Sequence, residues 1–69
     1  MTLTTLLDAD PRARRRLALF TVFTTRHVLG PLDAATLAEL PLRVEQRGAS
    51  VHVTLARRSL GSIALHDLV

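Results

Sequence analysis

Serine, histidine and aspartate, the residue types of a hydrolytic triad, stand close together near the C-terminus of this 69-residue chain. His66 and Asp67 are adjacent, and Ser59 and Ser62 precede them by a few residues. Neighbouring side chains on a strand point to opposite faces, and neither serine lies in a nucleophile-elbow motif. A triad also needs an oxyanion hole in a cleft that excludes water. We therefore expect no catalysis by these residues and predict that the protein is not an enzyme.

The residue pattern does not indicate a metal site or a cofactor site. The three histidines, His27, His52 and His66, are not spaced to share one helix face, and the chain has no cysteine. Its three glycines stand singly, so a glycine-rich phosphate loop is missing. The sequence predicts no bound metal and no cofactor.

The arginines offer a different function, because guanidinium groups bind phosphates well. All nine basic residues are arginines, against six acidic residues, and the formal net charge is +3. Arg12, Arg15 and Arg16 fall within one sector of a helix, and Arg57 and Arg58 in a hairpin loop would add a second clamp. These five residues make binding of DNA or RNA one hypothesis. The alternative is that the arginines of the helix only form a solvated first turn. The absence of lysine is then explained by a GC-rich, bacterial-like coding sequence, which favours arginine codons.

The most apolar segment of the chain, Leu17–Thr25, predicts a protein partner. It holds both phenylalanines, and a single domain over residues 1–69 buries only about 60% of its unfolded surface. Without disulfides or a metal, such a small domain gains stability mainly by burying surface against another chain. We expect a homo-oligomer, or a small subunit of a larger assembly, with Leu19, Val22 and Phe23 in the interface.

A long helix is expected around this segment. Asp10 as N-cap and Pro11 at the first helical position begin a helix over Arg12–Leu29, and a Gly-Pro pair ends it. One face of this helix carries Ala13, Leu17, Phe20, Thr24 and Val28. The alternative is a strand over Leu17–Thr25, because Phe, Val and Thr favour strands.

Two further helical segments flank the long one. Residues 1–9 are rich in Leu and Thr and would form a short helical arm. A short helix is expected at Asp33–Leu40, where Asp33 is the cap and Pro41 the stop.

From Leu42 onward the apolar residues recur with a period of two. Leu42–Arg47 and Val51–Ala56 are predicted to form a hairpin around Gly48–Ser50, and Ser62–Val69 a third strand after a connection at Arg57–Gly61. The expected apolar face comprises Leu42, Val44, Val51, Val53, Leu55, Ile63 and Leu65. The predicted fold class is α+β, with the long and short helices packed on a three-stranded antiparallel meander and the long helix covering the sheet.

A sheet edge is the second surface through which a partner is expected to bind. Leu42–Arg47 carries charges that protect an edge from pairing, whereas Ser62–Leu65 carries none. We therefore expect the C-terminal strand to make such a contact, through Ile63, Leu65, Leu68 and Val69.

The sequence also bears on location. Its N-terminus lacks the basic region and the long apolar core of a secretory signal. No apolar stretch approaches the roughly 20 residues of a membrane span. We expect a soluble, cytoplasmic protein that does not associate with membranes.

Overall fold

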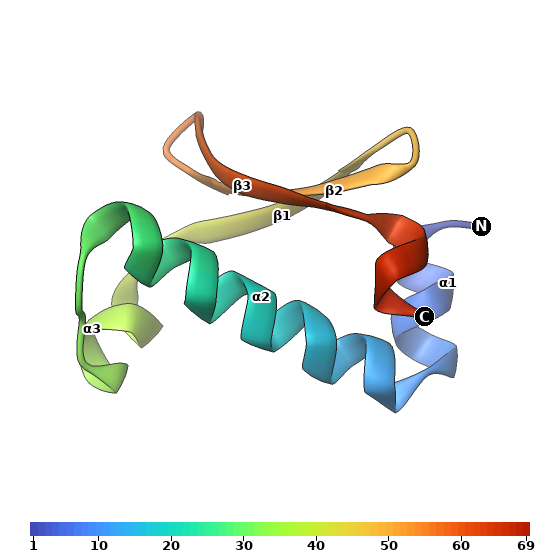
Figure 1. Ribbon diagram of the computed structural model, residues 1–69, viewed down its shortest axis with the longest axis horizontal. Coiled ribbons are helices and arrows are strands. Elements are labelled where there is room, and N and C mark those ends of the chain that lie inside the picture. The colour runs from blue at the N-terminus through green and yellow to red at the C-terminus, as the bar shows by residue number, and fades with distance from the viewer.

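The computed structural model describes the whole chain, Met1–Val69, and confirms the α+β class (Figure 1). Its elements in order are α1 (Leu3–Ala9), α2 (Pro11–Leu29), α3 (Ala34–Glu39), β1 (Leu42–Arg47), β2 (Ser50–Leu55), β3 (Arg58–Ala64) and the 3-10 helix η1 (Leu65–Leu68). The strands form one antiparallel meander in the order β1-β2-β3.

Side-chain caps begin the helices where the sequence indicates. The carboxylate of Asp10 accepts the backbone N–H of Arg12 at 2.9 Å, and Pro11 occupies the first helical position of α2. Gly30 ends this helix with φ of +93°, a conformation that residues with a Cβ rarely adopt. The prediction of a helix through Leu17–Thr25 is confirmed, and the alternative strand is wrong.

Two-residue turns join the strands. The pairs Arg47–Ser50 and Leu55–Arg58 close them. Gly48 supplies the positive φ of the first turn, whereas Ala56 and Arg57 adopt φ of +49° and +70° in the second. Two consecutive positive φ values are those of a type I′ turn, which normally contains Asn and Gly. Neither Ala56 nor Arg57 is therefore a residue type that indicates this tight turn.

The predicted third strand was wrong in both of its limits. Strand β3 begins at Arg58 rather than Ser62, because the turn before it occupies only two residues. It ends at Ala64, and Leu65–Leu68 turns away as η1, with the Leu65 N–H donating to the carbonyl of Ala49 at 2.7 Å. The 3-10 turn buries Leu65 and Leu68 against the helices.

A β-bulge in β3 brings the sheet into contact with α2. Val53 pairs with Gly61 and Thr54 with Ser59, so Leu60 is the extra residue. The carbonyl of Leu60 accepts a hydrogen bond from the Thr24 hydroxyl at 2.9 Å. Gly61 has no Cβ, which allows Thr24 and Phe20 to lie directly over the strand.

The main core lies where α1, the first half of α2 and η1 meet β2. Its buried members are Leu6, Ala13, Leu17, Val51, Leu65 and Leu68. The side chain of Gln46 accepts the N–H of Leu3 at 2.7 Å and so attaches α1 to β1. The N-terminal arm is therefore a docked part of the domain.

Helix α2 packs against β3 and leaves the β1 side of the sheet open. Val51 and Val53 of the central strand are fully buried, but Val44 of β1 is 38% exposed. Leu42, Leu55 and Ile63 are half-buried. The expectation that the long helix covers the sheet was wrong for β1, because one helix over an edge strand cannot reach across all three strands.

Candidate interaction surfaces

The side of α2 that faces away from the sheet carries an exposed apolar patch. Leu19 is 71% exposed and Phe23 70% exposed, and Val22 lies between them, half-buried. The ring of Phe23 stacks on His27, with centroids 6.2 Å apart and an angle of 9° between the planes. Together with Arg26 these residues line a depression of about 410 Å³. We call Leu19, Val22 and Phe23 the α2 patch.

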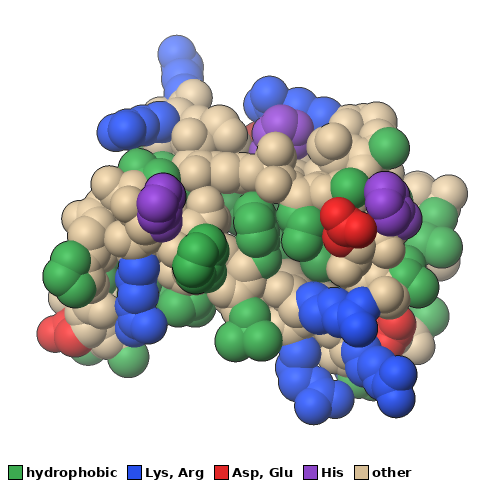
Figure 2. Space-filling view, viewed as in Figure 1, with side chains coloured by type: hydrophobic (Ala, Val, Ile, Leu, Met, Phe, Trp, Pro, Cys, Tyr) green, Lys and Arg blue, Asp and Glu red, His purple; other side chains and the backbone are tan.

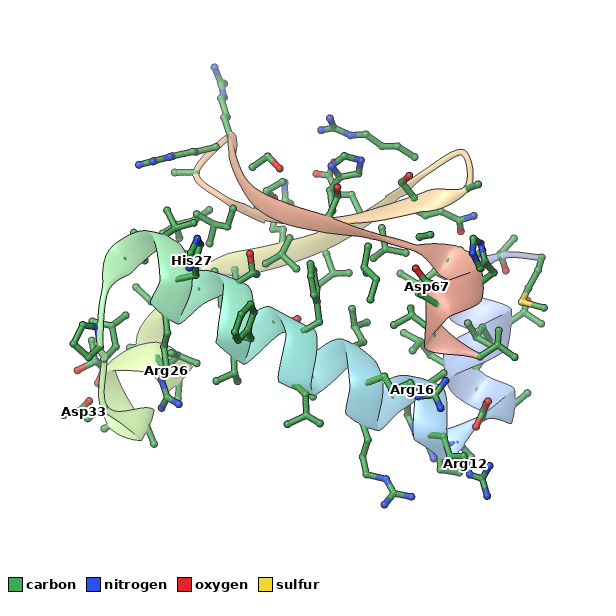
Figure 3. The ribbon with its side chains drawn as sticks, in the orientation of Figure 1. Arg12, Arg16, Arg26, His27, Asp33 and Asp67 are labelled. Carbon is green, nitrogen blue, oxygen red and sulfur yellow. The ribbon has the colours of Figure 1, made fainter.

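Arginines lie at both ends of this patch. Arg12, Arg15 and Arg16 border Leu19 at the N-terminal end of α2, and Arg26 lies at the C-terminal end. In Figure 2 the apolar side chains occupy the middle of the visible face and arginines lie toward its ends. Figure 3 shows Arg12 and Arg16 well separated from Arg26 and His27 along the helix. Helix α2 contains no acidic residue, so its own charges around the patch are all positive. Asp67 of η1 lies on the same face, above Arg16 (Figure 3).

Two of these arginines also bind the chain's own backbone. Arg16 donates through Nη1 to the carbonyl of Val69, which holds the C-terminus beside α2. Arg26 donates through Nε to the carbonyl of Leu32 at 3.3 Å, in the loop that follows the helix. The guanidinium groups of Arg12 and Arg15 make no hydrogen bond within the chain, although the Arg12 backbone N–H donates to Asp10.

Arg57 and Arg58 do not join this basic cluster. They lie at the β2–β3 turn, at the opposite end of the molecule from the N-terminus of α2 (Figure 1). The structure therefore does not bring the five predicted phosphate-binding arginines onto one surface, and the second clamp expected beside the first does not form within a single chain.

An apolar groove runs between α2 and β1. It has a volume of about 400 Å³, and its lining residues come from α1, α2 and β1: Leu7, Arg14, Leu17, Ala18, Thr21, Val22 and Val44. We call it the β1 groove. The sequence assigned Val44 to the covered face of the sheet, and only the position of α2 shows that Val44 borders an open groove instead.

The C-terminal residues predicted as interface are divided by the structure. Leu65 is 8% exposed and Leu68 fully buried, so their side chains already lie in the chain's own core. Ile63 packs against that core, and Val69 is 60% exposed. Of the four, Val69 alone offers a largely exposed side chain to a partner.

The residues considered for catalysis lie on the surface. His66 and Asp67 are exposed, and 3.3 Å separates the His66 Nε2 from the Asp67 Oδ1. Ser59 and Ser62, on β3, are exposed and make no side-chain hydrogen bond with this pair. His27, His52 and His66 lie on different elements, and no three potential metal-ligating side chains converge.

The carboxyl of Asp33 has a pKa below its usual value. Hydrogen bonds from the Thr36 side chain and then from the Thr36 backbone lower the pKa of Asp33, because both favour the charged carboxylate. The backbone bond, 2.7 Å long, is the N-cap of α3. This ionisation stabilises a helix terminus and does not belong to a reactive site.

No family model matches this chain. Comparisons with curated proteins and with solved structures also find no match. None of the helices combines the length and the apolar character that crossing a bilayer requires. The function proposed below therefore depends on the surfaces alone.

Proposed function

We propose that this protein is a cytoplasmic, non-enzymatic interaction module that acts as a homo-oligomer or as a small subunit of a larger assembly. The observation that carries the proposal is the exposure of Leu19 and Phe23 on one face of α2, at 71% and 70%. Burying each such side chain contributes about 1.5–3 kcal/mol. A contact that covers the α2 patch would therefore add several kcal/mol to a domain with a small core.

The charges around the patch indicate the chemistry of a partner from another chain. Arg12, Arg15 and Arg16 at one end and Arg26 at the other would face any surface that covers Leu19 and Phe23. A partner with acidic side chains on both sides of an apolar centre matches this arrangement, because opposite potentials favour the encounter and the orientation.

The test is the native mass of the purified chain and of its Phe23→Arg variant, measured by sedimentation at high micromolar concentration. We expect a mass above that of the monomer, and a lower average mass for Phe23→Arg with the same helix content by circular dichroism. Ala35→Arg, which adds the same charge at an exposed position of α3, is the matched control. A wild-type chain that is monomeric at this concentration would contradict the proposal.

Nucleic-acid binding is the second candidate, and one observation favours it. Arg12, Arg15 and Arg16 are all exposed and line one shallow depression of about 240 Å³ at the N-terminal end of α2. This placement opposes the helix dipole, so it is not explained by helix stability. Duplex phosphates would fit such a cluster.

Salt dependence tests the second candidate. The logarithm of the affinity for duplex DNA should fall linearly with the logarithm of the salt concentration, with a slope of about 0.9 per phosphate contact. Replacing Arg12 and Arg15 with alanine should lower that slope by roughly 2. Replacing Arg57 and Arg58 is the control from the other end of the molecule. The absence of a duplex shift at low salt excludes this function.

A further inference from the structure

We propose that two copies of this chain pair through β1, edge to edge and antiparallel, with Val44 on the two-fold axis. The proposal rests on the self-association proposed above and names a second surface for it. Two three-stranded sheets would then join as one continuous sheet with both α2 helices on the same face.

Strand β1 is the edge that is suited to pairing. It pairs with β2 in unbroken register from Leu42 to Arg47, so it is a regular strand. The other edge, β3, is interrupted by the bulge at Leu60, and bulges protect edges from pairing. The β1 groove also runs beside β1, so a chain added there meets apolar side chains.

Alternate residues of β1 direct their backbone N–H and C=O groups toward β2 and away from it. The β1–β2 turn decides which residues point each way. Arg47 and Ser50 close a two-residue turn, so they form a hydrogen-bonded pair. Hydrogen-bonded pairs alternate along the two strands, so the next one is formed by Glu45 and His52. The alternating residues Val44 and Gln46 therefore direct their N–H and C=O groups away from β2. Centring on Val44 pairs each Val44 with its copy and sets the Gln46 N–H of one chain opposite the Leu42 carbonyl of the other.

The charges on β1 favour this register over those centred on the two neighbouring residues. Centring on Val44 places Arg43 opposite Glu45 of the second copy, twice by symmetry. Centring on Glu45 instead places two glutamates opposite each other, and centring on Arg43 two arginines. Opposite charges across strands stabilise pairing and like charges destabilise it. The alternation that normally protects an edge is therefore self-complementary when the pairing centres on Val44.

A register centred on Gln46 also sets opposite charges face to face, Glu45 against Arg47. It overlaps the two strands over only three residues before the Gly48 turns meet, however, whereas the Val44 register aligns Leu42–Gln46. The Gln46 side chain, moreover, already binds the backbone of Leu3 and Gly48. Pairing at Val44 leaves those bonds in place and brings the two β1 grooves together at the axis.

Charge exchange tests the register in a Phe23→Arg background, which removes the contribution of the α2 patch. We expect Arg43→Glu and Glu45→Arg each to weaken the dimer at least about tenfold, because each sets like charges opposite each other twice. An equimolar mixture should recover the dimer, since every pair in the heterodimer is then of opposite charge. Both residues lie on the solvent side of the sheet, so the fold should persist.

Val44→Pro gives a second, independent variant. Proline removes an N–H that faces away from β2, so it should abolish dimers while leaving the hairpin intact. A Phe23→Arg chain that is already monomeric overturns pairing through β1 and leaves the proposed function standing, with association through α2. Dimers that persist unchanged in both charge variants overturn the Val44 register.

Discussion

Gly61→Ala tests how closely α2 packs on the bulged strand. A Cβ at this position would overlap the Thr24 hydroxyl and lie 3.2 Å from the Thr24 Cβ and 3.5 Å from the Phe20 ring. Thr24 is only 6% exposed, and its hydroxyl donates to the Leu60 carbonyl at 2.9 Å. To admit the methyl group, Thr24 must rotate and give up this hydrogen bond, or α2 must move away from β3.

The expected cost has two parts. Overpacking costs about 1–3 kcal/mol, and leaving the buried Leu60 carbonyl without a partner about 1–3 kcal/mol. Their sum, roughly 2–6 kcal/mol, is comparable to the about 3–5 kcal/mol that a core of this size supplies. We therefore expect Gly61→Ala to lose most of the domain's stability.

Thr24→Ala should rescue this variant in part, because it removes the hydroxyl that meets the new methyl group. Thr24→Ala alone should cost about 1–3 kcal/mol, because it leaves the buried Leu60 carbonyl without its hydrogen-bond partner. The double variant should then be more stable than the sum of the single effects predicts, with an interaction energy of about 1–3 kcal/mol.

Urea unfolding followed by circular dichroism measures the free energy of unfolding of the wild type, the two single variants and the double variant. All four are compared at one protein concentration, because association adds to apparent stability. Ser62→Ala, at the exposed neighbouring position, is the control. The packing argument is refuted if the free energy of unfolding of Gly61→Ala lies within about 0.5 kcal/mol of that of the control. The argument is also refuted if the effects of Gly61→Ala and Thr24→Ala on the free energy of unfolding simply add in the double variant.

Three further predictions concern turns, caps and the docked arm. Replacing Ala56 and Arg57 with Asn and Gly should raise the free energy of unfolding by about 1–2 kcal/mol, measured with urea, because both positions have positive φ. Asp33 has a lowered pKa when folded, so its contribution to stability is complete above its unfolded pKa and is lost as the pH falls through the folded value. The thermal midpoint should therefore fall more steeply in acid for the wild type than for Asp33→Asn, and equal slopes would speak against this. Gln46→Ala should lower the hydrogen-exchange protection of α1, whereas protection equal to the wild type would show that α1 is held by its leucines alone.

Much of the fold was predictable because local signals were strong. Asp10 and Pro11 mark the start of α2 as a cap and a first-turn proline, and the capping bond forms as expected. The alternation from Leu42 onward gives β1 and β2. The limits of β3 were not predictable in the same way, because Ala56 and Arg57 adopt positive φ without a glycine or asparagine to indicate it.

The surfaces were predictable only in part, because coverage depends on how elements pack. The apolar residues Leu19 and Phe23 could be assigned to the helix side opposite Ala13 and Leu17, and they are exposed. The position of α2 over β3 rather than over the whole sheet follows from the bulge and from Gly61, which no local pattern reveals. Hence the open groove beside Val44 was missed.

The native mass of the purified chain tests the central claim most directly. Sedimentation velocity at high micromolar concentration should give a mass above that of the 7.6 kDa monomer, because the α2 patch and the β1 groove are uncovered in a single chain. A single species at the monomer mass across the concentration range would contradict the account.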